Sequence, residues 1–285
     1  MNTLSKTRSI MNKFNIVANK RYGQNFLIDD NILQGIVSAA DITKEDLVIE
    51  IGPGLGNLTE YILNTAKYGL LVEIDPKMIA VLEDRFKDKT NYSLLNEDIL
   101  KVDIDALVEK IKSEKKMDFK SVKVVANLPY YITTPIIFQL LEDSNCIESI
   151  TVMVQKEVAE RMTADSHSKE YGILTIMVDY FSNANIDIIV PNSSFIPEPG
   201  VTSAVITLKK NRKYEVNNEK VFFELVHKAF AQRRKKMTNS LSSNNFNNMS
   251  KQEIEELFTK CELSLTTRAE ELETTDFVNI ANNIK

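Results

Sequence analysis

Cysteine, histidine and tryptophan are scarce in this chain of 285 residues, which has two cysteines, two histidines and no tryptophan. Cys146 and Cys261 are far apart and show no CxxC spacing, so the sequence indicates neither a disulfide framework nor a zinc site. His167 and His227 are too few for a histidine-based metal centre or catalytic triad. We therefore expect no metal, and a function that depends on other side chains.

Long apolar runs are also absent from the sequence. No run approaches the roughly 18 residues that cross a membrane, and the N-terminal residues lack the apolar core of a signal peptide. We expect a cytoplasmic protein that does not bind membranes. The composition, 43% hydrophobic and 26% charged, is typical of globular proteins, and the length allows one large domain and one small domain.

Basic residues are not in excess, and the net charge of −5 argues against a uniformly basic nucleic-acid-binding protein. Their distribution is uneven, however. Residues 1–21 carry lysines and arginines but no acid, and Arg233, Arg234, Lys235 and Lys236 form a second basic block. Each group could be a solvated tail or helix face, or a patch that binds RNA phosphates.

A glycine-rich turn follows the first predicted strand of the core, residues 47–51. Gly52, Gly54 and Gly56 alternate in this turn, and the acid Glu50 stands just before them. Glycine lets the backbone turn sharply and approach a ligand closely, and the helix predicted to follow directs its amide ends toward that ligand. The spacing differs from the dinucleotide pattern GxGxxG. An acid beside the turn suits a cationic ligand, which favours S-adenosylmethionine over NAD.

The next two predicted strands also end in acids. The strand at residues 69–74 delivers Glu73 about twenty residues past the glycines, where an acid bonds ribose hydroxyls in nucleotide-binding α/β folds. The strand at residues 92–95 is followed by Asp98, which could accept a hydrogen bond from an adenine amino group beside Ile99, or simply cap a helix. Right-handed crossovers would bring these strand ends to one edge of a parallel sheet.

A fourth predicted strand, residues 122–126, ends at Asn127-Leu128-Pro129-Tyr130. The amide oxygen of Asn127 and a backbone carbonyl can accept both N–H bonds of an exocyclic amine, while Tyr130 can stack on a flat base. The tetrapeptide contains no good nucleophile or metal ligand, and taken alone it could be a proline-containing turn. Together with the other strand ends, it predicts an α/β protein that binds a nucleoside-like cofactor and a base.

A second aromatic residue, Phe195, stands in a stiff loop between two predicted strands, in the segment Phe195-Ile196-Pro197-Glu198-Pro199. It could be another stacking surface for a flipped base, or a residue that packs the loop against the domain.

A polar, charged stretch at residues 209–220 indicates a linker, and everything after it is helical in pattern. The sequence thus predicts an α/β domain over residues 1–208, with a basic N-terminal extension, and a small helical domain over residues 209–285.

Several separated motifs resemble the bacterial ribosomal RNA small-subunit adenine dimethyltransferases, the kasugamycin-sensitivity methyltransferases, over about residues 20–283. The motifs are Gln24–Leu27, Glu50–Gly56, Asn127–Tyr130 with Thr134-Pro135, Ser168–Gly172, Phe195–Pro199 with Ser203–Val205, Ala229–Lys235 and Arg268–Leu272. The resemblance implies a class I S-adenosylmethionine-dependent methyltransferase fold, which is a Rossmann-like seven-stranded sheet with its last strand reversed, plus a helical C-terminal RNA-binding domain.

The resemblance also implies the residues that contact S-adenosylmethionine, with Glu73 on the ribose and Asp98 on the adenine amine. The expected cofactor contacts, including neighbours at the same strand ends, are Asn25, Leu27, Glu50, Gly52, Gly54, Glu73, Ile74, Asp98, Ile99 and Asn127. The expected catalytic residues are Asn127, Leu128, Pro129, Tyr130 and Phe195. Two positions depart from the family pattern, since Tyr131 stands where many relatives have Asn and Gly200 where many have Lys.

The activity implied is transfer of two methyl groups to N6 of each of two adjacent adenosines in the 3′-terminal hairpin of 16S rRNA, by a monomer that acts on the small ribosomal subunit in ribosome biogenesis. Three alternatives stay open: a macrolide-resistance-type 23S rRNA dimethyltransferase, a protein that is mainly a ribosome-assembly factor, and a non-catalytic RNA-binding relative. The segments Gln232–Lys235 and Arg268–Leu272 favour the small-subunit enzyme over the first. The intact segment Glu50–Gly56 and the Asn127 tetrapeptide argue against the last.

Overall fold

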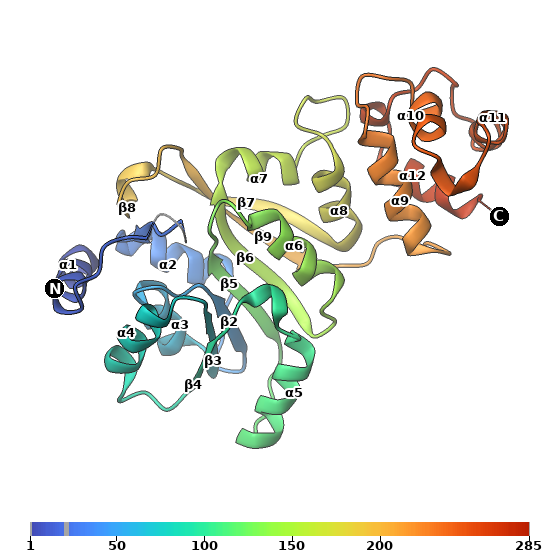
Figure 1. Ribbon diagram of the computed structural model, residues 1–285. Coiled ribbons are helices and arrows are strands. Elements are labelled where there is room, and N and C mark those ends of the chain that lie inside the picture. The colour runs from blue at the N-terminus through green and yellow to red at the C-terminus, as the bar shows by residue number, and fades with distance from the viewer. Residues whose placement is uncertain (1, 20–22, 285) are drawn as a thin grey trace. The chain divides into compact units, whose positions relative to one another are not determined.

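The computed structural model describes residues 2–19 and 23–284. Its contacts separate two compact units (Figure 1): Met1–Ala159 with Ala184–Lys210, and Glu160–Asn183 with Asn211–Lys285. Among the described residues, no helix is both long and apolar enough to cross a membrane.

The division differs in one respect from the single boundary predicted between residues 208 and 209. Residues 160–183 group with the C-terminal helices because α8 (Ile173–Phe181) is buried on most of its sides, against α9 (Glu219–Phe230). The Tyr180 ring of α8 stacks on Phe222 of α9 with 4.7 Å between the ring centroids.

The first unit is built on a seven-stranded sheet. Its strands, in spatial order, are β4 (Tyr92–Asn96), β3 (Tyr68–Glu73), β2 (Leu47–Ile51), β5 (Val122–Asn127), β6 (Ile147–Gln155), β9 (Ser203–Lys210) and β7 (Ser182–Val190). Neighbours from β4 to β6 pair in parallel, and the last strand, β9, pairs antiparallel with β6. The predicted Rossmann-like sheet with a reversed last strand is therefore confirmed.

Burial along the strands matches their positions in the sheet. Strands β2 and β3 are buried throughout, as expected for parallel strands that helices cover on both faces. In contrast, β7 at the edge alternates between more and less exposed positions, which indicates that one face is covered.

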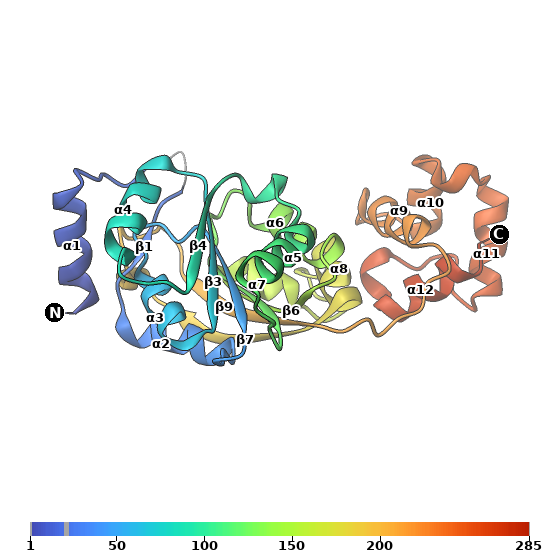
Figure 2. The same cartoon turned by 90° about the horizontal axis from the view of Figure 1, so that it is seen from below.

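Helices lie on both sides of the sheet, with α2 and α3 on one side and α5 and α6 on the other (Figure 2). The helices of the first unit are α1 (Thr3–Lys13), α2 (Asp30–Ala39), α3 (Asn57–Thr65), α4 (Pro76–Phe86), α5 (Ile104–Lys115) and α6 (Thr133–Glu142), with the short 3-10 helices η2 (Ile99–Lys101) and η3 (Asn192–Ser194). Helix α7 (Lys156–Met162) begins in the first unit and ends in the second. Aspartates begin three of them: Asp29, Asp75 and Asp103 each accept a backbone N–H in the first turn of α2, α4 and α5.

A two-stranded ribbon adds a segment from near the N-terminus to the first unit. In it, β1 (Phe26–Leu27) pairs antiparallel with β8 (Phe195–Ile196), so that Leu27 lies opposite Phe195. The pairing continues past β1, because the Ile28 N–H donates to the Ser194 carbonyl at 2.9 Å.

The basic N-terminal extension forms helix α1, whose side chains contact the first unit. Lys6 pairs with Glu60 at 2.9 Å, and Lys13 pairs with Asp84 at 2.6 Å. Two more of the basic residues, Lys20 and Arg21, lie outside the described residues. Part of the predicted basic extension is therefore neutralised within the protein.

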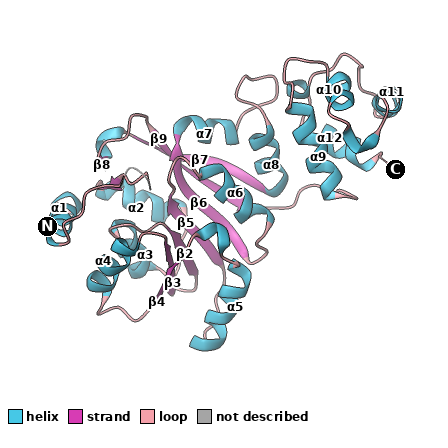
Figure 3. Ribbon diagram, viewed as in Figure 1, coloured by secondary structure: helices cyan, strands magenta, loops and turns pink. Residues whose placement is uncertain are grey.

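The second unit consists of helices and loops (Figure 3). Besides α8 and α9, its helices are α10 (Met237–Ser243), α11 (Lys251–Lys260), α12 (Thr274–Asn282) and the short 3-10 helices η4 (Phe246–Asn248) and η5 (Ala269–Glu271). Its core is aromatic in part, since the Phe230 and Phe277 rings stack with 6.0 Å between centroids. The predicted helical character of the C-terminal part is confirmed.

Candidate active site

A cavity opens where β2, β3, β4 and β5 end, at the edge of a parallel sheet where α/β proteins bind ligands. Every predicted cofactor contact lines it: Asn25, Leu27, Glu50, Gly52, Gly54, Glu73, Ile74, Asp98, Ile99 and Asn127. Leu128, Pro129 and Tyr130 line it as well. The structure thus brings together residues that come from four strand ends and from the segment before α2.

The glycine turn between β2 and α3 needs its glycines for two different reasons. Gly52 has a φ of +64°, which residues with a Cβ adopt rarely, although a side chain there would meet nothing within 4 Å. At Gly56, with a φ of +82°, a Cβ would lie 2.7 Å from the Phe86 ring. Gly56 therefore permits both the turn and the close packing of α3 against α4, while Gly52 leaves backbone open toward the cavity.

Glu50, the acid at the start of the turn, is buried. Its Oε2 accepts a hydrogen bond of 2.6 Å from the Thr59 hydroxyl in α3. Burial raises the pKa of Glu50 to about 8; the Thr59 bond opposes this shift, and the charge of Glu73 adds to it. A cationic group in the cavity would favour the ionised form of Glu50, as expected for the ammonium end of an amino acid.

Glu73, at the end of β3, holds the glycine turn in place. Its Oε2 accepts the Gly54 N–H at 3.0 Å, and its Oε1 accepts the Asp75 N–H at 2.8 Å. Burial raises the pKa of Glu73, and these two N–H donors oppose the rise. Each oxygen retains a further lone pair, so the carboxylate can still accept from a ribose diol.

Asp98 does cap a helix, which was one of its two interpretations. Its Oδ1 accepts the Leu100 N–H at 3.1 Å at the start of η2. Its Oδ2 makes no hydrogen bond with the part of the chain that the structure describes, and it is available to an adenine amine. Gln139 of α6 steadies this turn by donating to the Ile99 carbonyl at 3.1 Å.

Asn127 is oriented by a neighbour that is remote in sequence. Its Nδ2 donates to the Asn25 carbonyl at 3.0 Å. Because this bond assigns the nitrogen to Asn25, the Oδ1 atom is the half of the amide that can accept from a substrate. The sequence alone gave no reason to fix the amide this way.

The two carbonyls that follow Asn127 differ in availability. The Pro129 carbonyl accepts from the Thr133 hydroxyl at 3.0 Å and from the Ile132 N–H at 3.3 Å, so the turn into α6 already occupies it. No such bond involves the Leu128 carbonyl among the residues described. Of the two carbonyls considered as a second acceptor, the Leu128 carbonyl is therefore the one that is free to accept a hydrogen bond from a substrate amine.

Tyr130 and Tyr131 both line the cavity. The Tyr130 hydroxyl is 2.7 Å from Ser203 Oγ, at the first residue of β9, which fixes the ring. Tyr131 is 57% exposed at the mouth of the cavity. In the sequence, Tyr131 stood out only as a departure from the family pattern. Its position directly after the Asn127 tetrapeptide was the one feature that could have indicated a place in the cavity.

Phe195 is the exception among the predicted catalytic residues. Its side chain is 1% exposed and packs in a core cluster with Leu27, Val190 and Val205, and it does not line the cavity. The cause is its pairing with Leu27 in the β1–β8 ribbon. The prediction of a stacking surface is therefore corrected, and the alternative, a residue that packs its loop down, describes Phe195.

Arg233 likewise differs from the predicted phosphate-binding role. Its Nε donates to Glu270 Oε2 at 2.7 Å, its Nη2 donates to the Ser168 carbonyl at 2.9 Å, and its Nη1 donates to the Lys169 carbonyl. Since these contacts occupy all three nitrogens, Arg233 joins segments of the second unit to each other. This role corrects its place in the basic block.

The remaining residues of the block, Arg234, Lys235 and Lys236, are exposed in the turn between α9 and α10. They form no ion pair with an acid in the residues described. They stay available for phosphate groups. No group of three or more His, Cys, Asp or Glu side chains that could hold a metal occurs among the described residues.

Three further residues line the cavity without having been predicted from the sequence: Phe26 of β1, Leu55 of the glycine turn and Asn57 at the start of α3. Leu55 and Phe26 are apolar and gave no chemical signal. Asn57 follows Gly56 directly, which was the one available hint.

The sheet order, the reversed β9 and a ligand cavity at the glycine turn define a class I methyltransferase. The comparisons with known proteins give the family. Residues 15–285 match the family model described as ribosomal RNA adenine dimethylase. The chain belongs to the ribosomal RNA adenine dimethylase family.

Full-length relatives agree with this family. The protein named ribosomal RNA small subunit methyltransferase A from Lachnoclostridium phytofermentans is 43% identical, over 98% of this chain and 96% of that protein. The protein of the same name from Clostridioides difficile is also 43% identical, over 98% of this chain and 94% of that protein.

Among solved structures, a dimethyladenosine transferase from Plasmodium falciparum has a TM-score of 0.73 at 27% identity, covering 90% of this chain and 95% of that one. The 23S rRNA methyltransferase ErmE, at 21% identity, has a TM-score of 0.67 over 91% and 99% and shows the same fold.

The protein is therefore an S-adenosylmethionine-dependent adenine dimethyltransferase that acts on ribosomal RNA. The cavity fits this cofactor, because it offers acceptors at Glu73 and Asp98, a buried acid at Glu50 and open backbone at Gly52.

Proposed function

We propose that the protein dimethylates N6 of two adjacent adenosines in the 3′-terminal hairpin of 16S rRNA, acting as a cytoplasmic monomer on the small ribosomal subunit during its biogenesis. The relatives that are 41–43% identical over 98% of the chain and carry the small-subunit name support this target. The observation that carries the chemistry is the fixed amide of Asn127, whose Nδ2 is bound to the Asn25 carbonyl.

The reaction needs help at the acceptor nitrogen. The N6 lone pair of adenine is delocalised into the ring, so the amine is a poor nucleophile. We assign Asn127 Oδ1 and the Leu128 carbonyl as acceptors of the two N6 hydrogens, which draws the nitrogen toward a tetrahedral geometry. Tyr130 holds the base by stacking. No general base is required before attack, since the proton can leave from the cationic product.

Bound S-adenosylmethionine supplies an already activated methyl group on its sulfonium. Glu73 accepts from the ribose hydroxyls, and Asp98 accepts from the adenine amine. Ile74 and Ile99 flank the adenine ring, and Glu50 faces the ammonium end. The backbone of Gly52 and Gly54 and the segment that contains Asn25 and Leu27 complete the site. In the second unit, Arg234, Lys235 and Lys236 bind RNA phosphates.

A labelling experiment distinguishes this proposal from its alternatives. Separated ribosomal subunits from cells that lack the enzyme are incubated with the protein and labelled S-adenosylmethionine. We expect label in 16S rRNA of the small subunit, and N6,N6-dimethyladenosine as the final nucleoside, with the monomethylated form appearing early and declining. Label in 23S rRNA would support a large-subunit enzyme, and tight binding without label would support an assembly factor.

A further inference from the structure

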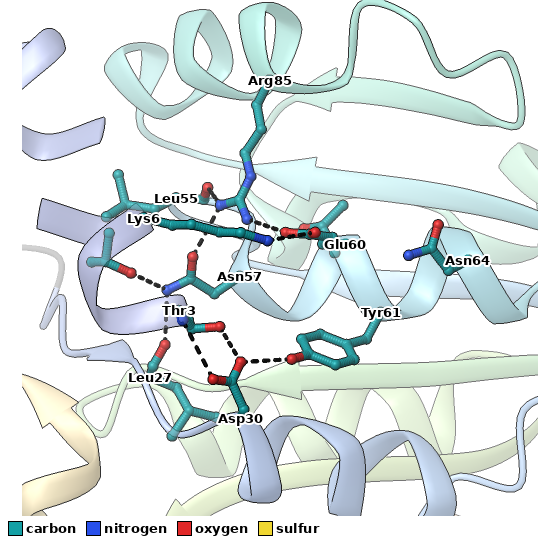
Figure 4. Close-up of polar contacts among 12 residues, drawn as sticks. Thr3, Lys6, Leu27, Asp30, Leu55, Asn57, Glu60, Tyr61, Asn64 and Arg85 are labelled. Carbon is teal, nitrogen blue, oxygen red and sulfur yellow. Dashed lines mark hydrogen bonds and ion pairs between the residues drawn. The ribbon is translucent and has the colours of Figure 1, made fainter. Parts of the chain in front are cut away.

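Helix α1 contacts the wall of the cofactor cavity through a polar network that is buried at its centre, Asn57 (Figure 4). Asn57 is the first residue of α3 and is 6% exposed. Its Nδ2 donates to the Leu27 carbonyl and to Thr7 Oγ1, each at 2.8 Å, and its Oδ1 accepts from Arg85 Nη1 at 2.9 Å. The amide thus bonds three different elements at once.

Arg85 extends the network to the glycine turn. Its Nη1 also donates to the Leu55 carbonyl at 2.6 Å, and its Nη2 donates to Glu60 Oε2 at 2.7 Å. Glu60 in turn accepts from Lys6 of α1 at 2.9 Å. Figure 4 shows Lys6 and Arg85 converging on Glu60. The carbonyl of Leu55 and the first helix are therefore linked through two side chains.

The network joins two walls of the cavity. Leu27 belongs to β1 and Leu55 to the glycine turn, and both residues line the cavity. Asn57 bonds the carbonyl of the first, and Arg85 bonds the carbonyl of the second, while Asn57 and Arg85 bond each other. The Asn57 and Arg85 side chains therefore hold the spacing between these walls.

Helix α1 is seated by further contacts of two kinds. The Thr3 hydroxyl donates to Asp30, which also accepts from the Tyr61 hydroxyl at 2.7 Å. On its apolar side, α1 packs Ile10 and Met11 against a cluster that includes the cavity-lining residues Phe26 and Leu55. Thr7, the contact of Asn57, is completely buried. The helix is therefore placed to hold the network.

We propose that Asn57 is a positioning residue for the cofactor, held by Thr7 of α1 and by Arg85, and that it sets the distance between the Leu27 and Leu55 walls. If the walls are already correctly spaced before the ligand binds, no free energy is lost in ordering them on binding. The affinity for the ligand is therefore higher. The proposal rests on the proposed function only for the identity of the ligand, S-adenosylmethionine. The family match begins at residue 15, so it does not cover α1 and its contact residue Thr7.

Calorimetric binding of S-adenosylmethionine to the full chain, without RNA, tests the proposal. Asn57→Ala should weaken binding about tenfold, and Thr7→Val, which removes only the hydroxyl on α1, about threefold. Thr7→Ser keeps the hydroxyl and should restore wild-type affinity. Lys13→Gln removes the exposed α1 pair with Asp84 and should change nothing. With RNA present, KM for the cofactor should rise in parallel while kcat at saturating cofactor stays near wild type.

A purely structural role gives a different result. If Asn57→Ala and Thr7→Val lower the thermal midpoint but leave the cofactor affinity and KM unchanged, the positioning role is overturned. Should Asn57→Ala fail to fold, the comparison of Thr7→Val with Thr7→Ser decides the matter by itself. A wild-type protein that binds the cofactor but methylates no rRNA would defeat the proposed function, and the binding series would still test Asn57.

Discussion

The cofactor cavity and the basic block of the second unit differ in how far the protein already uses their polar groups. At the cavity, Asn127, Glu73 and Asp98 each bond the protein with some of their donors or lone pairs and retain lone pairs that can accept from a ligand. In the basic block, Arg233 bonds the protein through each of its three nitrogens, whereas its neighbours make no ion pair within the described residues. A side chain that is partly hydrogen-bonded to the protein is held in one orientation and can still bond a ligand. This property suits a site where reacting atoms must be aligned.

The largest effect is expected at Asn127, where alignment matters most. Asn127→Ala removes the acceptor oxygen, so methyl transfer should fall at least about a hundredfold, while cofactor affinity changes much less. Asn127→Asp keeps acceptor oxygens but cannot donate to the Asn25 carbonyl, and it should show an intermediate loss. Rates at saturating cofactor measure both. The control variant is Asn185→Ala, which changes an exposed asparagine on β7. Near-normal turnover in Asn127→Ala would show that Asn127 has no role in the mechanism.

Glu50 should make the stability of the ligand-free protein depend on pH. Its folded pKa of about 8 lies above its unfolded value, so the stabilisation is complete below the unfolded pKa and is lost as the pH rises through about 8. Glu50→Gln has no carboxyl to ionise, so it does not lose this stability and should be more stable than the wild type at pH 9, by up to about 5 kcal/mol. Urea unfolding at pH 5, 7 and 9 measures the difference.

Parallel stability curves for the two proteins over that range would contradict the raised pKa of Glu50. Binding of a cationic cofactor should also release a proton from the wild type near pH 7 but not from Glu50→Gln, and calorimetry in buffers of different ionisation enthalpy detects this release.

Glu73→Ala should weaken S-adenosylmethionine by about 1 to 3 kcal/mol, because it removes a charged acceptor and frees the Gly54 N–H. Calorimetry gives the affinity, and the exposed α4 residue Glu83, changed to Ala, is the matched control. Unchanged affinity in Glu73→Ala would count against a ribose contact.

The smallest effects are expected in the basic block, where single contacts are screened by salt. Changing Arg234, Lys235 and Lys236 together to Gln should weaken binding to small subunits and lower the slope of log K against log salt by up to about one unit for each lost contact. Arg233→Gln should instead lower the thermal midpoint and leave the salt slope as in the wild type. An unchanged thermal midpoint together with a lower salt slope in Arg233→Gln would show instead that Arg233 binds RNA.

The residues that line the cavity could be predicted from the sequence where chemistry and order along the chain coincide. Gly52, Gly54, Glu73 and Asp98 all lie at or shortly after the ends of predicted strands. Parallel pairing then brings such strand ends to one edge of the sheet. The carbonyl that Asn127 binds was not predictable, because Asn25 is remote in sequence and is brought there by the fold.

The errors share the same cause. Phe195 was open to two interpretations until its pairing with Leu27, far away in the sequence, showed that it is buried. Arg233 belongs by sequence to a run of four basic residues, but its partners Ser168 and Glu270 come from distant loops. A run of like charges does not reveal which member the protein itself will bind.

The two acceptors assigned at the tetrapeptide have a consequence for how the reaction stops. In the proposed mechanism, unmodified adenine brings two N6 hydrogens to Asn127 Oδ1 and the Leu128 carbonyl, monomethyladenine brings one, and dimethyladenine brings none. Because the turn into α6 occupies the Pro129 carbonyl, it offers no substitute. Each unpaired acceptor costs binding free energy, so affinity should fall stepwise as methyl groups are added. In this proposal the affinity of the site depends on how many N6 hydrogens the base still carries. Dimethyladenine, the final product, is therefore the base that the site binds most weakly.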